Sequence, residues 1–297
     1  MIAHALVFVA SPEDKPAYRE ALLMLGRVAL SRKLPPPEVL SGWESAQWIY
    51  ESVDGELRQE AAAAVAELPV DWALVPLAGR RKRLLVADMD STIINVECLD
   101  ELADFAGIKT EIAAITERAM RGELAFEPAL IERVSKLKGL ALDALRRTYD
   151  ERVRLNPGAT LLVRTMAKHG ARCVLVSGGF SFFTARVAEA AGFHADHANR
   201  LLDDGAALTG EVAAPILGRA AKLETLRREA AALGAASSDA LAIGDGANDL
   251  DMIKAAGLGI AYRAKPIVAI EAHARIDYTG LDAALFFQGY RRGDFAA

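Results

Sequence analysis

Cysteine is nearly absent from this chain, since Cys98 and Cys173 are the only two in 297 residues. Two cysteines form no disulfide framework, and we interpret both as reduced side chains packed as small hydrophobes. Long apolar runs are missing as well, because no charge-free stretch approaches the roughly 20 residues that a membrane helix needs. An excess of positive charge is also missing, since the formal net charge is −5. The sequence therefore predicts no membrane partner and no nucleic-acid partner.

The apolar start of the chain, residues 1–10, lacks the basic segment that opens a signal peptide, so a cytoplasmic location is expected. Hydrophobic residues make up 52% of the chain and charged residues 25%, which is ordinary globular composition. A length of 297 residues suits one large domain or two ordinary ones.

Residues 1–77 are predicted to form a small α+β domain. Apolar patterning predicts strands at 5–10, 39–40, 46–50 and 70–77 and helices at 17–30 and 56–68. This order, βαββαβ, is the split ferredoxin-like pattern. The basic run 79–83 follows, and we interpret it as a solvated linker at the domain boundary.

Residues 78–297 are predicted to form an α/β domain, because short buried strands alternate there with helices. Strands are expected at 84–87, 173–176, 240–243, 258–262 and 275–278, and helices at 159–169, 182–191, 220–233 and 250–256. Such alternation predicts a Rossmann-like parallel sheet with helices on both faces. Two segments interrupt it: an inserted helical cap at about 96–153 and a hairpin at 199–212.

Three predicted strands end in polar sequence that a buried strand would not contain. Asp88-x-Asp90 follows the first, Ser177-Gly178-Gly179 the second and Asp245-Gly246-x-Asn248-Asp249 the third. Because parallel strands end at one edge of a sheet, where ligands bind, these residues are expected to meet.

The residue types suit phosphoryl transfer from a small ester. An aspartate can attack phosphorus, a second carboxyl can move protons, and Mg²⁺ can neutralise the phosphoryl charge. Ser177, Gly178 and Lys222 are candidates for a phosphate cradle.

Taken together, these motifs resemble a known family. Asp88 to Thr92, Ser177 to Gly179, Lys222 and Gly244 to Asp249 are similar to the four ordered motifs of the haloacid dehalogenase-like phosphatases. Within that superfamily the resemblance is closer to the phosphoserine phosphatases and covers roughly residues 84–285. The cap segment 119–126 and the segments 133–134, 176–180 and 198–201 carry it too.

The resemblance implies Mg²⁺-dependent hydrolysis of O-phosphoserine to serine and phosphate through an aspartyl-phosphate, the last step of serine biosynthesis. It implies Asp88 as nucleophile and Asp90 as general acid/base. Mg²⁺ would be held by the Asp88 and Asp245 side chains and the Asp90 backbone carbonyl. Glu97 and Arg133 would hold the ammonium and carboxylate of the substrate, a charge pairing that suits a zwitterion. The remaining implied residues are Ser177, Gly178, Lys222 and Asn248 as phosphate or substrate contacts, Asp249 as a support for Lys222 or metal-bound water, and Met120 and Phe126 as pocket walls.

Several alternatives stay open at this point. A related phosphatase or phosphotransferase acting on phosphothreonine, phosphohomoserine or another small ester fits the same motifs, and a non-catalytic amino-acid sensor is the rival from another class. Residues 1–77 resemble ACT-type regulatory domains, which suggests amino-acid binding or dimerisation, and a homodimer is left open. The glycine-containing turn usual after the first ACT strand is absent here. His194 and His197 lack a third ligand, so we predict no metal pair there and place both in a loop or beside the hairpin.

Overall fold

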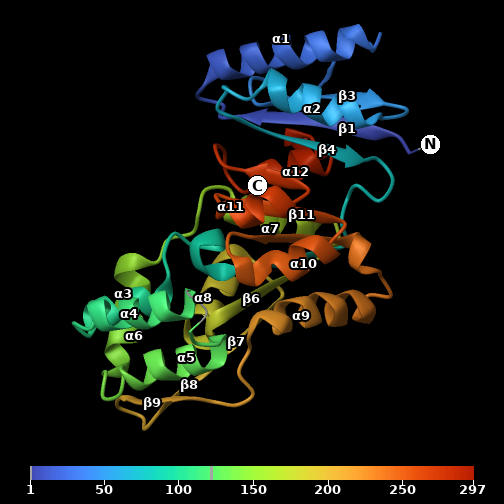
Figure 1. The fold of residues 1–297 in the computed structure, drawn as a ribbon. Helices are drawn as coiled ribbons and strands as arrows, with labels where there is room; N and C mark the ends of the chain where they lie inside the picture. The colour runs from blue at the N-terminus through green and yellow to red at the C-terminus, as the bar shows by residue number, and fades with distance from the viewer. Residues whose placement is uncertain (1, 121–122) are drawn as a thin grey trace.

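The computed structural model describes residues 2–120 and 123–297, with the side chain of residue 120 also outside the description. Residues 4–76 form an antiparallel sheet whose strands run in the order β2-β3-β1-β4. Helices α1 and α2 cover its outer face (Figure 1). The bounds are β1 His4–Ala10, α1 Lys15–Ser31, β2 Glu38–Ser41, β3 Ser45–Tyr50, α2 Gly55–Ala64 and β4 Val70–Pro76. The predicted βαββαβ order is confirmed, although the second helix ends four residues earlier than expected, at Ala64 rather than Leu68.

The second sheet is parallel, with its strands in the order β12-β11-β10-β5-β6-β7. Its strands are β5 Leu84–Ala87, β6 Arg172–Phe180, β7 Ala195–Asn199, β10 Ala240–Gly244, β11 Leu258–Tyr262 and β12 Ala274–Ile276. Its covering helices are α7 Ala159–Lys168, α8 Ser181–Ala191, α9 Arg219–Ala232, α10 Leu250–Ala255, α11 Pro266–Glu271 and α12 Ala283–Phe287. Alternate residues of β5 face different cores: Leu85 packs with α7 and α8, and Leu84 with α9 and α10. The predicted Rossmann-like sheet is confirmed.

Two details of this sheet differ from the sequence expectation. The second strand continues to Phe180 instead of ending at Val176, so Ser177-Gly178-Gly179 lies within β6. The pairing of β6 with β7 is irregular between Val176 and Phe180, which exposes this stretch to the site described below. The edge strand β7 was not predicted, and it contains His197.

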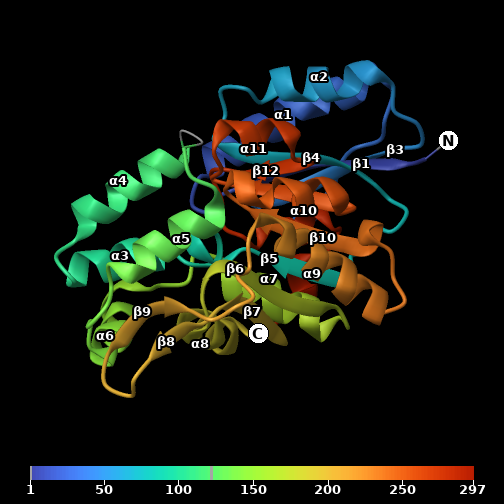
Figure 2. The same ribbon diagram turned by 60° about the horizontal axis from the view of Figure 1, so that its bottom comes forward.

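A helical cap follows the turn after β5, and the described part of it lies to one side of the parallel sheet (Figure 2). Its helices are α3 Cys98–Phe105, α4 Lys109–Met120, α5 Phe126–Ser135 and α6 Leu142–Arg152. The predicted hairpin is formed by β8 Leu201–Asp203 and β9 Leu208–Val212, and it packs against α5. Helix α5 lines the same cavity as the residues at the carboxyl ends of β5 and β10, so the cap borders this edge of the sheet, and its four helices match the four helical segments predicted from the sequence.

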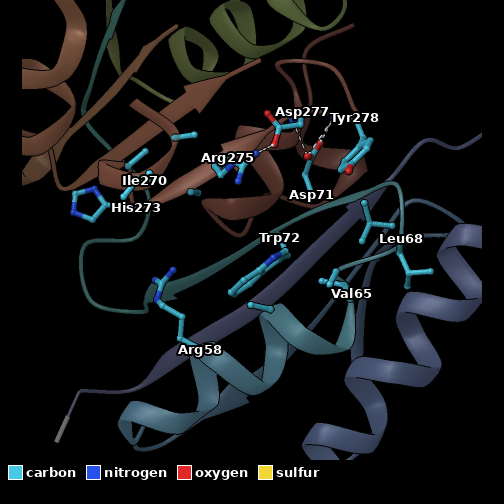
Figure 3. Close-up of a pocket in the computed structure, with 16 residues that line it drawn as sticks. Arg58, Val65, Leu68, Asp71, Trp72, Ile270, His273, Arg275, Asp277 and Tyr278 are labelled. Atoms are coloured by element: carbon cyan, nitrogen blue, oxygen red, sulfur yellow. Dashed lines mark hydrogen bonds and ion pairs between the residues drawn. The ribbon is translucent and has the colours of Figure 1, made fainter. Parts of the chain in front are cut away.

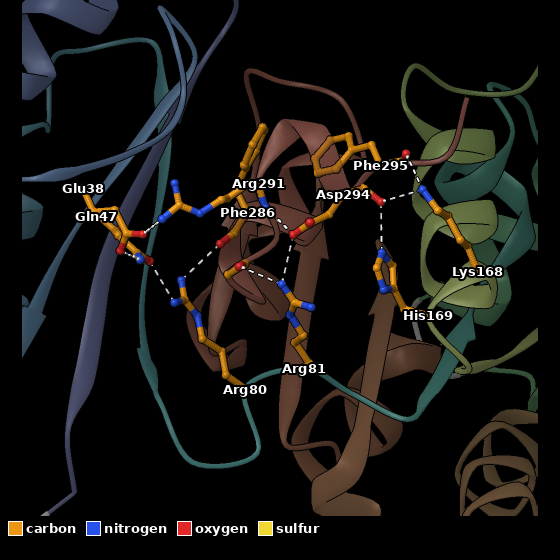
Figure 4. A network of polar contacts seen from close by, with 11 residues as sticks. Glu38, Gln47, Arg80, Arg81, Lys168, His169, Phe286, Arg291, Asp294 and Phe295 are labelled. Atoms are coloured by element: carbon orange, nitrogen blue, oxygen red, sulfur yellow. Dashed lines mark hydrogen bonds and ion pairs between the residues drawn. The ribbon is translucent and has the colours of Figure 1, made fainter.

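The inner face of the antiparallel sheet packs on the rest of the protein. Val7 and Val75 share one apolar core with Phe286 of α12. A polar network lies beside this contact (Figure 4), where Arg80 donates to the carbonyls of Phe286 and Phe287 at 3.1 and 2.7 Å. The interpretation of residues 79–83 as a solvated linker is therefore wrong for Arg80, which is only 9% exposed.

Candidate active site

The site begins where β5 ends. The backbone N–H of Asp88 donates to the carbonyl of Ile243 at 3.0 Å, which holds the ends of β5 and β10 together. The chain then turns sharply through residues 89–93, with Ser91 in the left-handed region at φ +56°. A non-glycine residue rarely adopts this conformation, and such residues gather at functional sites. The turn brings Asp90 to the lining of the same cavity as Asp88.

A buried ammonium lies beside the first carboxylate. Lys222 of α9 is 3% exposed, and its Nζ lies 2.6 Å from an oxygen of Asp88 and 2.6 Å from an oxygen of Asp249. The second oxygen of Asp249 accepts a hydrogen bond from the N–H of Gly246 at 3.0 Å. Burial alone would lower the pKa of Lys222, but Asp249 and Asp88 together raise it. The lysine therefore stays charged and fixes the position of the Asp88 carboxylate.

The same cluster carries excess negative charge. Carboxylate oxygens of Asp88, Asp245 and Asp249 lie within 4.8 Å of one another. Burial and the Asp249 charge raise the pKa of Asp88, against the attraction of Lys222. With the Lys222 ammonium against three carboxylates, the cluster has more acidic than basic groups, and a divalent cation with a preference for oxygen ligands would balance them. Because both oxygens of Asp249 are already bonded, Asp88 and Asp245 are the better placed side-chain ligands.

Asp90 has a different environment from Asp88, because hydrogen bonds from uncharged donors surround it. The N–H of Cys98, the first residue of α3, donates to one oxygen at 2.9 Å, and the Ser177 hydroxyl donates to the other at 3.0 Å. Burial raises the pKa of Asp90, while these hydrogen bonds oppose the shift. A Cβ at Gly179 would lie 2.9 Å from a carboxylate oxygen of Asp90, so a larger residue there would displace that carboxylate.

A cavity of about 430 Å³ opens between this edge of the sheet and the cap. Phe126, Leu130 and Arg133 of α5 form its cap side, and Asp88, Asp90 and Asp245 lie on its sheet side. Ser177, Gly178 and Asn248 also line it. The sheet side of the cavity therefore carries carboxylates that can bind a metal ion. The side near the cap carries acidic residues, including Glu97, and the basic residue Arg133.

Two ionisable side chains near the cap, Glu97 and Arg133, face this cavity, and neither forms an ion pair within the part of the chain that the structure describes. Burial and the Asp90 charge raise the pKa of Glu97 to about 7, although the Ser91 hydroxyl donates to it at 2.6 Å. Burial lowers the pKa of Arg133, and the charges of Asp100 and Glu97 oppose that shift. Among the described residues, no carboxylate lies within ion-pair distance of Arg133, whose Nε donates to the carbonyl of Ala129 at 3.2 Å. Its two terminal nitrogens are therefore available to an anionic ligand.

Comparisons with known proteins agree with this geometry. A family model described as haloacid dehalogenase-like hydrolase matches residues 85–254. A phosphoserine phosphatase from Streptomyces coelicolor is 44% identical over 243 residues, which are 81% of this chain and 59% of that protein. Another from Polaromonas sp. is 44% identical over 208 residues, which are 68% of this chain and 88% of that protein. The chain belongs to the phosphoserine phosphatase family of haloacid dehalogenase-like hydrolases.

This membership confirms the family predicted from the motifs, and the family implies a divalent cation at the acidic cluster. Likeness to a solved structure extends over nearly the whole chain. A crystal structure of a HAD family hydrolase from Salmonella enterica has a TM-score of 0.83 and 28% sequence identity. The match covers 96% of this chain and 98% of that one, so it includes the N-terminal βαββαβ unit.

The structure brings most of the predicted site residues of this phosphatase to one cavity, but not all of them. Lys222 and Asp249 lie behind the cavity wall, buried against Asp88. Met120 ends α4, and its side chain lies outside the described residues, as do residues 121 and 122 of the predicted cap segment. Phe126 does form part of the wall.

Sequence reasoning missed five residues that line the cavity: Leu99, Asp100, Thr116, Leu130 and Lys265. It included Ser91, Gly179, Phe180 and Gly246 in its motif segments but assigned them no role. Asp100 follows Glu97 by one helical turn, and this spacing was a signal for a second acid on the same side. Burial and the Asp249 charge raise the pKa of Asp245, and the attraction of Lys265, three residues after β11, opposes that shift. The place of Lys265 after a strand end was a usable signal as well.

Proposed function

We propose that this protein hydrolyses O-phosphoserine to serine and inorganic phosphate with Mg²⁺ as cofactor. The observation that supports this most is that Asp88 and Asp245, with Lys222 behind them, lie at the same cavity as Glu97 and Arg133, which form no ion pair among the described residues. The cluster suits a phosphoryl group, and the opposite charges suit the ammonium and carboxylate of an amino acid.

In the proposed mechanism, an oxygen of Asp88 attacks phosphorus and the bond from phosphorus to the serine oxygen breaks. Asp90 gives its proton to the departing oxygen, and serine leaves. A water molecule then attacks the aspartyl-phosphate, Asp90 takes a proton from that water, and phosphate is released with Asp88 restored. A Mg²⁺ ion held by the Asp88 and Asp245 side chains and the Asp90 carbonyl would supply positive charge to the phosphoryl oxygens.

Other residues of the chain support these steps by position. Lys222 holds the attacking carboxylate, and Asp249 holds Lys222. The Ser177 hydroxyl, the Gly178 backbone and the Asn248 side chain would contact the phosphoryl group or the substrate at the open end of the strands. Asn199 anchors this stretch, because its amide donates to the carbonyl of Gly178 at 2.8 Å.

Replacing the nucleophile tests the proposal. Asp88→Asn removes the attacking carboxylate and is expected to reduce Mg²⁺-dependent phosphate release to background, with an unchanged circular dichroism spectrum. Asp251→Asn is the matched control, because Asp251 pairs with Arg219 in an exposed position. Folded Asp88→Asn protein that releases phosphate at the parental rate would contradict the assignment.

A substrate panel separates the proposal from its relatives. For the parent protein, kcat/KM for O-phosphoserine is expected to exceed kcat/KM for phosphothreonine and phosphohomoserine. A higher kcat/KM for either of these would make that ester the substrate instead.

Three further expectations remain predictions. These are a cytoplasmic location, a homodimer, and an ACT-like regulatory or dimerisation role of residues 1–77 beside a catalytic domain of 78–297. No helix in the described ranges is long and apolar enough to cross a membrane.

A further inference from the structure

A second cavity, of about 360 Å³, lies where the two sheets meet. The edge strands β4 and β12 pack against each other there, and Asp71 of β4 accepts hydrogen bonds from the backbone N–H groups of Asp277 and Thr279 at 2.8 and 2.9 Å. Beside this junction, α2 and α11 leave a hollow between them (Figure 3). We call it the seam hollow, and its main lining residues are Arg58, Val65, Trp72, Ile270, His273 and Arg275.

Arg58 brings an uncompensated positive charge to the seam hollow. Its guanidinium lies 5.8 Å from the centre of the Trp72 ring and donates to the carbonyl of Leu74 at 3.3 Å. Burial lowers the pKa of Arg58, and no acidic neighbour in the described chain opposes that shift. The Arg58 side chain is exposed to solvent at the mouth of the seam hollow and has no carboxylate partner among the described residues, so its charge is available to an anionic ligand.

The other polar groups of the seam hollow add donors rather than negative charge. Nδ1 of His273 accepts a hydrogen bond from the N–H of Gly259 at 2.9 Å, so a neutral ring carries its proton on Nε2. Burial, Arg58 and Lys82 all lower the pKa of His273, which keeps the ring neutral. Arg275 is paired with Asp277 at 2.7 Å, and the Asp71 carboxylate is already bonded to backbone N–H groups.

Aromatic and aliphatic surface lies next to this charge. Trp72 is half-buried in the seam hollow, while Ile270 and Tyr278 are 81% and 54% exposed at its rim. A ligand with a flat apolar ring packed on the Trp72 indole and an anionic group at the Arg58 guanidinium would contact both the apolar surface and the charge. The single planar fork of Arg58 matches a carboxylate better than a phosphate, which takes more donors.

A short helix connects the seam hollow to the catalytic cavity. Lys265, directly before α11, lines the catalytic cavity, and its N–H donates to the carbonyl of Asp245 at 3.1 Å. Ala269 and Ile270, near the other end of α11, line the seam hollow. A six-residue helix spans about 9 Å, so a displacement at one end moves the other.

We propose that the seam hollow binds a small organic carboxylate with a flat apolar body, and that its occupancy alters the catalytic cavity through α11. The carboxylate would be held by Arg58 and by Nε2 of His273, and the body would lie against Trp72. The coupling part of this proposal rests on the proposed phosphatase function, whereas the binding part does not.

Isothermal titration calorimetry with benzoate tests the binding part. Benzamide has the same ring without the charge, so the parent protein is expected to bind benzoate at least tenfold more tightly than benzamide. Arg58→Gln is expected to weaken benzoate binding about tenfold or more. Arg27→Gln, an exposed arginine of α1, is the matched control and is expected to bind like the parent. Equal binding of benzoate and benzamide, no heat from benzoate, or an Arg58→Gln variant that binds like the control would each overturn the site.

Further measurements separate the seam hollow from the catalytic cavity. Arg133→Gln is expected to keep benzoate binding, and loss of binding in that variant would place benzoate at the catalytic cavity and overturn the proposal. Benzoate is expected to change the KM for O-phosphoserine in the parent and in Arg27→Gln but not in Arg58→Gln. Binding without any change in KM or kcat would refute the coupling through α11 and leave the binding site standing.

Discussion

Arg133 gives the sharpest test of substrate recognition in this protein. Its guanidinium is half-buried in the cavity wall and forms no ion pair among the described residues. Its Nε donates a hydrogen bond to the carbonyl of Ala129 in the same helix. Only the two terminal nitrogens are therefore left for a substrate carboxylate. Arg133→Gln removes the charge and the fork but keeps a polar side chain of similar length.

The expected magnitude follows from those two donors. A hydrogen bond to a charged group contributes about 1.5–3 kcal/mol, so two give about 3–6 kcal/mol before screening. Because solvent reaches the half-buried site, we discount this to about 2–4 kcal/mol. At about 1.4 kcal/mol per factor of ten, kcat/KM for O-phosphoserine should fall about 30- to 700-fold.

The assay compares two substrates and two variants. O-phosphoethanolamine lacks the carboxylate but keeps the ammonium and the phosphate, so Arg133→Gln should change its kcat/KM less than threefold, within about 0.6 kcal/mol. Arg118→Gln in the same cap breaks an exposed pair with Glu132 and should leave both substrates unaffected. An equal loss on both substrates in Arg133→Gln would refute carboxylate recognition by this residue.

Three other perturbations test separate parts of the structure. Because the pKa of Glu97 is raised to about 7, its carboxyl is neutral below that pH and anionic above it, so kcat/KM for O-phosphoserine should rise through pH 7. Glu97→Gln should lose this rise, and a variant with the parental pH profile would contradict the role of Glu97. Asp71→Ala removes the carboxylate that accepts hydrogen bonds from the backbone N–H groups of residues 277–279, and it should lower the free energy of unfolding in urea by about 2–4 kcal/mol. The control Asp143→Ala, on the exposed face of α6, should change the free energy of unfolding by less than about 0.5 kcal/mol. Excess EDTA should stop phosphate release, and Mg²⁺ but not K⁺ should restore it; full activity in EDTA would argue against a divalent cation.

Much of this architecture was predictable because its signals are local. The buried strand before Asp88 and the four cap helices follow from apolar periodicity over a few residues, and the strand-end acids mark one edge of the sheet. The fate of Arg80 was not predictable in this way. Its burial depends on the carbonyls of Phe286 and Phe287, which lie more than 200 residues away in sequence. A basic run gives no local sign of such partners.

Part of the site could not be predicted from the sequence either, because it also depends on contacts between residues that are far apart in the chain. Lys222 and Asp249 carry motif signals, yet their position behind the cavity wall depends on the packing of α9 and α10. The stretch Ser177-Gly178-Gly179 looks like a loop by composition, but pairing around Phe180 keeps it in a strand. Asp100 and Lys265 belong to no motif, and their positions after Glu97 and after β11 were weak signals that did not by themselves place them in the cavity.

The two acids that follow β5 can be assigned different roles from their surroundings. Burial raises the pKa of both Asp88 and Asp90. Asp88 is held by the Lys222 ammonium at 2.6 Å and belongs to the cluster that fits a cation, and each positive charge favours its carboxylate form. The Asp90 side chain lies outside that cluster, and its oxygens accept hydrogen bonds from the uncharged donors of Cys98 and Ser177. A divalent cation held by that cluster would favour the anion at Asp88 more than at Asp90, which supports the proposed roles of Asp88 as nucleophile and Asp90 as proton donor.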